Sequence, residues 1–178
     1  MKKLAILILL ALELAVCGCG TTSPSNQVNT QTSGLWEAQL TGGTGQASLL
    51  TFTTQFSVLN TGPLDIKSFG FINAGACFGT TANTTTETGT ATLVTGSTDQ
   101  VTGTLNFTVT SITPAGNTLA LTGNLTGTSN GTTGTTGTLS NGVVSGTWTL
   151  TGGQGDPSCV VPQGTFLMCQ GTATCTVP

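Results

Sequence analysis

The feature that most constrains the fold of this chain is a regular alternation of two residue types in short runs. In residues 101–109, valine, glycine, leucine and phenylalanine occupy every second position, and threonine or asparagine lies between them. Residues 119–125 repeat the alternation with leucine and glycine. Successive side chains of a β-strand point to opposite faces, so this pattern predicts strands with one face in a core and the other in water.

Nine such runs follow residue 33, and turn residues separate them. They cover residues 36–40, 50–58, 64–72, 88–95, 101–112, 118–126, 135–139, 143–151 and 165–175. The residues expected to face the core in the first two runs are Trp36, Ala38, Leu40, Leu50, Phe52, Phe56 and Val58. No stretch after the first twenty residues has the apolar spacing of a helix.

The connections between the runs indicate how the strands are joined. Asn60-Thr61-Gly62-Pro63, Pro114-Ala115-Gly116-Asn117 and Ser140-Asn141-Gly142 are short turn sequences, and residues 73–87 form a longer loop rich in Gly and Thr. We therefore predict an all-β fold, an antiparallel up-and-down meander of eight or nine strands. It must close into a barrel or a sandwich to hide its edges, and the absence of long crossovers favours the barrel.

Composition excludes several classes of partner. Only 5% of the 178 residues are charged, histidine is absent, and Lys2, Lys3 and Lys67 account for every Lys and Arg. Lys and Arg neutralise phosphate in nucleic-acid complexes, so no nucleic-acid partner is expected. The shortage of cations also argues against electrostatic binding to anionic lipid headgroups.

The same shortage removes most catalytic arrangements. Without histidine, neither a Ser-His-Asp nor a Cys-His site can form. Lys67 is expected to pair with Asp65, two residues away on the same strand face. The carboxylates are dispersed singly along the chain, so we predict no catalytic residues, no metal site and no cofactor.

The first twenty residues specify export. Lys2 and Lys3 precede an unbroken apolar run at residues 4–12, which Glu13 ends well short of the roughly 20 residues of a spanning helix. Val16-Cys17-Gly18-Cys19 then resembles the lipobox of bacterial lipoproteins, whose signal is cut before a cysteine that receives a diacylglyceryl group. Cys17 is the alternative anchor, but Gly18 before Cys19 fits the family better than Val16 before Cys17.

The resemblance implies an organisation and an address. It implies a signal peptide at residues 1–18 and a lipid on Cys19. The polar composition after Cys19 predicts a lipidated flexible tether at residues 19–33, and the length of the remainder predicts a single β domain at residues 34–178. The membrane is then a partner through the lipid on Cys19. Gly20 stands where Asp retains lipoproteins at the inner membrane, which implies the outer membrane where the cell has one.

Four cysteines remain after Cys19 is assigned to the anchor. An even number of cysteines in an oxidising compartment predicts two disulfides, and Cys77, Cys159, Cys169 and Cys175 allow three pairings. Cys169 and Cys175 can pair only if the chain turns between them, and Gly171 offers that turn. We favour Cys169 with Cys175, and Cys77 with Cys159.

Two weaker resemblances bear on function. Gly34-Leu35-Trp36 resembles the G-x-W opening of lipocalins, barrels that hold small apolar ligands, although the arginine that covers the tryptophan in that family is absent here. The T-x-T repeats at residues 86–90, 108–110 and 147–151 resemble the rows of ice-binding proteins, at irregular intervals. Threonine that simply covers the wet face of strands is the simpler reading.

We therefore expect a cell-envelope lipoprotein with a non-catalytic β domain and a structural or interaction role. The expected partner in that role is another envelope protein. The alternative is a carrier of a small apolar ligand, which would require Gly103, Gly123 and Gly146 to leave space inside the barrel. A surface-binding protein and an enzyme are the less favoured readings.

Overall fold

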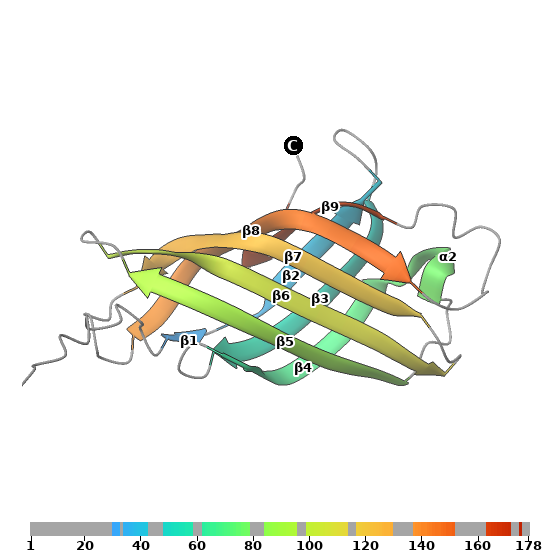
Figure 1. The fold of residues 1–178 in the computed structure, drawn as a ribbon, viewed down its shortest axis with the longest axis horizontal. Helices are drawn as coiled ribbons and strands as arrows, with labels where there is room; N and C mark the ends of the chain where they lie inside the picture. Colours follow the sequence, from blue (N-terminus) through green and yellow to red (C-terminus); the bar gives the residue numbers. More distant parts are fainter. Residues whose placement is uncertain are drawn as a thin grey trace, which may run out of the picture.

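The computed structural model describes residues 30–32, 34–42, 48–58, 62–78, 84–95, 99–113, 117–129, 137–151, 163–171 and 175. This part of the chain contains nine strands and one helical turn (Figure 1). The strands are β1 (Thr30–Thr32), β2 (Trp36–Thr41), β3 (Ser48–Val58), β4 (Leu64–Asn73), β5 (Thr84–Thr95), β6 (Gln100–Thr113), β7 (Thr118–Ser129), β8 (Gly137–Thr151) and β9 (Gln163–Gln170), and the helical turn is α2 (Gly75–Phe78).

The sheet is an up-and-down meander that closes on itself. Its strand order is β4-β3-β2-β9-β8-β7-β6-β5, and all neighbours in this order are antiparallel. Strands adjacent in sequence are therefore adjacent in the sheet, and the pairing of β2 with β9 joins the two halves. Figure 1 shows the resulting eight-stranded, nearly closed barrel, which confirms the predicted fold class.

The barrel has two distinguishable ends. β1 pairs in parallel with the first residues of β8, Gly137 to Leu139, so it marks one end, which we call the β1 end. The connection from β4 to β5 lies at the opposite end and contains α2, so we call it the α2 end (Figure 1). Because the strands alternate in direction, β4 starts at the β1 end and β5 starts at the α2 end.

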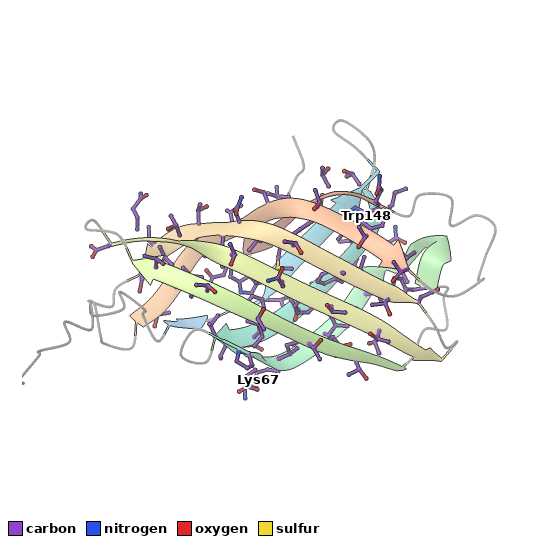
Figure 2. All side chains as sticks on the ribbon, in the orientation of Figure 1. Lys67 and Trp148 are labelled. Atoms are coloured by element: carbon purple, nitrogen blue, oxygen red, sulfur yellow. A yellow bond between two sulfur atoms is a disulfide. The ribbon has the colours of Figure 1, made fainter. Side chains whose placement is uncertain are left out.

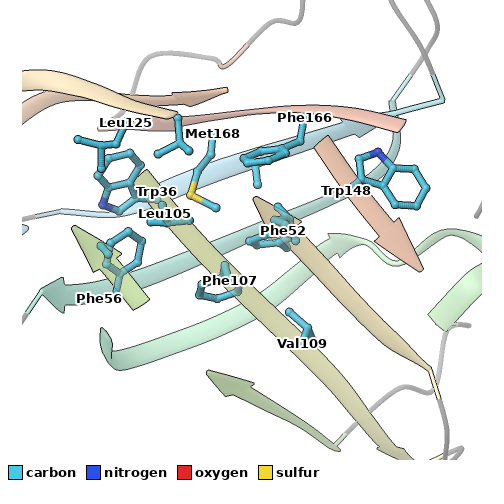
Figure 3. Packing of buried hydrophobic residues seen from close by; sticks show 14 of the residues in the cluster. Trp36, Phe52, Phe56, Leu105, Phe107, Val109, Leu125, Trp148, Phe166 and Met168 are labelled. Carbon is cyan, nitrogen blue, oxygen red and sulfur yellow. The ribbon is translucent and has the colours of Figure 1, made fainter. Parts of the chain in front are cut away.

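The apolar face of each run lines the interior, as the alternation predicts. All seven residues named above for the first two runs are buried, as are Val101, Leu105, Phe107, Val109, Leu119, Leu121 and Leu125. Aromatic rings fill the middle of this core (Figure 3). Phe52, Phe69 and Phe107 contact one another, with ring-centroid distances of 5.0, 5.8 and 6.2 Å, and Trp36 stacks on Phe56 at 5.3 Å.

β8 differs from the prediction, because Ser140-Asn141-Gly142 is not a hairpin turn. The residues before and after this segment pair with the same neighbouring strand, β7. The register shifts between Thr126 and Thr128, and Asn141 has a φ of 53°, so the extra residue forms a β-bulge. Asparagine adopts this left-handed conformation more readily than most residues. Residues 137–139 and 143–151, which the sequence assigns to two strands, therefore belong to one strand, β8.

Two smaller differences concern strand boundaries. β5 begins at Thr84, so part of the predicted loop at residues 73–87 is strand, and α2 is a helical turn within it. β1 lies within residues 19–33, the stretch that the sequence assigns to a flexible tether. The local sequence pattern cannot predict β1, because its pairing partner in β8 lies about a hundred residues further along the chain.

Candidate functional site

The ionisable side chains of the described residues are spread over the barrel. Glu37 lies on β2, Glu87 on β5, and Asp99 immediately before β6. Lys67 on β4 forms the predicted ion pair with Asp65, on the outside of the barrel (Figure 2). No group of three or more His, Cys, Asp or Glu that could hold a metal ion occurs among the residues that the structure describes.

The cysteines fall into two groups. Cys169 at the end of β9 and Cys175 form a disulfide, with 5.5 Å between their Cα atoms. Gly171 has a φ of 98° and its N–H donates to the carbonyl oxygen of Leu35 at 2.8 Å, so the chain turns where the sequence suggested. The side chain of Cys77 and all of Cys19 and Cys159 lie outside the described residues, so the pairing of Cys77 with Cys159 and the anchor stay predictions.

Threonine covers the outer face of β5 to β8. The ladders align the outward residues of the four strands into rows, for example Thr90, Asn106, Thr122 and Thr147. Within that row the Thr122 hydroxyl donates to Asn106 Oδ1 at 3.0 Å. The rows are therefore in register although their intervals in sequence are irregular, but they follow a curved sheet rather than a flat face (Figure 1).

The interior glycines Gly103, Gly123 and Gly146 each lie against a backbone carbonyl group of the neighbouring strand. A Cβ on Gly123 would lie 2.7 Å from the carbonyl oxygen of Ser145 and 2.8 Å from Phe166 Cζ, and one on Gly146 would overlap the carbonyl oxygen of Thr122. Gly123 and Gly146 are cross-strand partners, and Phe166 on β9 is the next residue in the same row. The Phe166 ring, which points into the barrel (Figure 3), therefore packs directly against Gly123.

The two buried tryptophans differ in their hydrogen bonds. Trp148 Nε1 donates to the carbonyl oxygen of Thr41 at 2.9 Å. Gly164 permits this bond, because a Cβ there would overlap the same carbonyl oxygen and lie 2.7 Å from Trp148 Nε1. Trp36 Nε1 is buried but has no hydrogen-bond partner among the described residues.

The barrel has one weak junction, between β4 and β5, which we call the seam. The described residues of these strands meet at a single bridge between Pro63 and Thr90, where the Ala91 N–H donates to the carbonyl oxygen of Gly62 at 2.9 Å. Beyond the bridge, towards the α2 end, no ladder joins residues 66–73 of β4 to residues 84–88 of β5. We call this stretch the open part of the seam.

Glu87 lies on β5 at the open part of the seam and faces the barrel interior. It shares its strand face with Gly89, Ala91 and Leu93, of which the last two are buried. Its Oε1 is buried and has no hydrogen-bond partner in the part of the chain that the structure describes. Glu87 falls at the end of the loop predicted at residues 73–87, and its place on the inward face follows from the start of β5 at Thr84.

Comparison with known proteins returned no relative. No protein-family model, no curated protein and no solved structure matches this chain. The fold and the residues described above therefore define a class only, a small up-and-down β-barrel with a filled core and one open seam. No helix in the described ranges is both long and apolar enough to cross a membrane.

Proposed function

We propose that this chain is a lipid-anchored protein of the bacterial cell envelope whose β-barrel binds another envelope component and performs no catalysis. The observation that carries the proposal is the sequence Val16-Cys17-Gly18-Cys19, directly after an apolar run of signal-peptide length. Cys19 would carry the lipid, and Gly20 favours the outer membrane.

The topology of the barrel fits an anchor at the amino terminus. The described chain enters the barrel through β1, at the β1 end. An anchor at Cys19 would therefore hold the β1 end towards the membrane and direct the α2 end away from it. The α2 end, with the open part of the seam, is then the end presented to other envelope components.

The side chains of the barrel support a binding role rather than catalysis. Lys67, the one cation of the described residues, is paired with Asp65 on the outer surface. The carrier alternative requires free space at Gly123 and Gly146, where a Cβ would lie 2.7 Å or less from a backbone carbonyl oxygen. We therefore propose that the outer surface or the seam of the barrel recognises the other envelope component.

Acylation of two single variants tests the anchor. Cys19→Ser should abolish incorporation of labelled fatty acid and release the protein from the membrane fraction, whereas the matched control Cys17→Ser should keep both. Mass spectrometry should find the mature amino terminus at Cys19 with its lipid. A lipid-free mature protein that starts after Cys19, or loss of lipid in Cys17→Ser alone, would contradict the proposal.

A further inference from the structure

We propose that the open part of the seam accepts an extended strand from a partner protein, which pairs with the edge of β5 and presents a basic side chain to Glu87. The inference rests on the proposed function, since it names the class of envelope partner and the residues that select it. Four features of the seam lead to it.

The first feature is the direction of the backbone groups of β5. In an antiparallel strand, alternate residues point both their N–H and C=O groups to the same side. The N–H of Ala91 points across the seam to Gly62, so Glu87 and Thr85 point theirs across the seam too. No ladder within the described residues uses these groups. These N–H and C=O groups are spaced as in any β-strand, so a second strand alongside β5 can form hydrogen bonds with each of them in turn.

The second feature is the apolar floor beside this edge. Phe71 packs against Phe69 and Phe78, with ring centroids 5.1 and 4.9 Å apart. Phe78 is buried, but Phe69 and Phe71 keep part of their surface exposed. An added strand whose inward side chains are apolar would cover that surface, at about 25 cal/mol for each Å² removed from water.

The third feature is the unpartnered carboxylate. Glu87 as a whole is partly exposed, but its Oε1 is buried without a hydrogen-bond donor in the described part of the barrel, and a buried polar atom is costly unless it is hydrogen-bonded. The only described cation, Lys67, lies on the outer face and is paired with Asp65. A Lys or Arg on the inward face of the added strand would supply the missing donor through a charge-assisted hydrogen bond.

The fourth feature explains why neither β4 nor a second copy of this protein pairs with the open edge of β5. Pro63 directly precedes β4, and the register of β4 with β3 shifts between Gln55 and Phe56, at Lys67. Proline, lysine and bulges are devices that keep a strand edge from pairing. A symmetric antiparallel pair of two β5 edges centred near Glu87 would bring two carboxylates together, which is destabilising.

Synthetic nine-residue peptides provide the test, with the full mature lipoprotein in detergent micelles. The first peptide has valine at odd positions except for a central lysine, and threonine at even positions. The second has glutamate at the centre, and the third is the lysine peptide with N-methylated backbone amides. Fluorescence anisotropy measures binding, and amide hydrogen exchange locates it.

The expected result is saturable binding of the lysine peptide, at least about tenfold tighter than the glutamate peptide, with slowed exchange at the Thr85 and Glu87 amides. N-methylation should abolish binding. Glu87→Gln should remove the preference for lysine, whereas the matched control Glu37→Gln, on the outer face of β2, should keep it.

Several results would overturn the inference. They are absence of saturable binding by the lysine peptide, equal binding of the N-methylated peptide, a lysine preference that survives Glu87→Gln, and dimers without peptide that protect the same β5 amides. The last result would identify a second copy as the occupant. None of these results depends on the lipid on Cys19. Failure of the proposed strand binding is therefore distinguishable from failure of the proposed anchor.

Discussion

Replacing Gly123 by alanine measures how tightly the barrel interior is filled. The new Cβ would lie 2.7 Å from the carbonyl oxygen of Ser145, 2.8 Å from Phe166 Cζ and 2.9 Å from Val144 Cγ1. The first of these neighbours is backbone held in the β7–β8 ladder, so it cannot move away without distorting the sheet. All three distances are shorter than ordinary van der Waals contacts between such atoms.

The change in the free energy of unfolding of Gly123→Ala is the sum of two opposing effects. Alanine restricts the unfolded chain and so favours folding by about 0.4–1 kcal/mol. Overpacking a filled core costs about 1–3 kcal/mol, and the fixed carbonyl of Ser145 places this site towards the upper value. We expect the free energy of unfolding of Gly123→Ala to fall by about 1–2 kcal/mol. The opposite sign would follow only if the Ser145 carbonyl and the Phe166 ring moved aside, because the methyl group would then be buried without strain.

Gly70→Ala is the matched control, since nothing lies within 4 Å of its Cβ position. Its free energy of unfolding should stay the same or rise by up to about 1 kcal/mol. Equilibrium urea denaturation, followed by the emission of the buried Trp36 and Trp148, measures both variants, with an unchanged m-value as the test of comparability. A Gly123→Ala protein as stable as Gly70→Ala would refute the close packing at Gly123 and favour the ligand-carrier alternative.

Three further variants test other parts of the structure. Trp148→Phe should lower the free energy of unfolding by about 1–2 kcal/mol more than Trp36→Phe, because it leaves the buried Thr41 carbonyl unpaired; equal urea midpoints would contradict the bond. Cys175→Ser should cost about 2 kcal/mol, the loop-closure value for a sequence separation of 6, and leave peptide binding at the seam intact; loss of that binding would give the disulfide a role beyond stability. Gly164→Ala should cost more than Gly123→Ala, because its Cβ would overlap the Thr41 carbonyl oxygen; a urea midpoint at or above that of Gly123→Ala would refute this.

The fold class was predictable because the period-2 alternation is a local property of the chain. Thr108 and Val109, for example, are neighbours in sequence and lie on opposite faces of β6, and this follows from strand geometry alone. The turn at Gly171 was predictable for a similar reason. A straight strand from Cys169 to Cys175 would hold the cysteines about 20 Å apart at roughly 3.3 Å per residue, too far for a disulfide.

The bulges were not predictable, because they depend on the neighbouring strand. Asn141-Gly142 favours a hairpin turn when read alone, but β7 continues alongside it and absorbs the extra residue as a bulge. Lys67 interrupts the alternation of residues 64–72 in the same way, where the register of β4 with β3 shifts. Leu64 and Ile66 before the shift, and Phe69 and Phe71 after it, all contact the core.

The candidate site was hidden for a different reason. Glu87 could be assigned to the inward face once β5 was known to begin at Thr84, but nothing in its own segment shows that β4 stops pairing beside it. The seam is a property of two strand edges that meet in space. Residue patterns within one strand carry no information about the strand that is missing from its edge.

The composition of the barrel explains why its one open edge needs both protection and selectivity. A surface with few charges and many threonines has little electrostatic repulsion to prevent contact between copies, so an unpaired strand edge on it is a hazard. Pro63 and Lys67 protect the β4 edge, whereas the β5 edge relies on the inward carboxylate of Glu87. A carboxylate repels another copy of itself and an apolar strand alike, since either would leave it buried and unpaired. In the interaction proposed above, a strand with a basic inward side chain would remove this penalty, so Glu87 would both keep the edge from aggregating and select its partner.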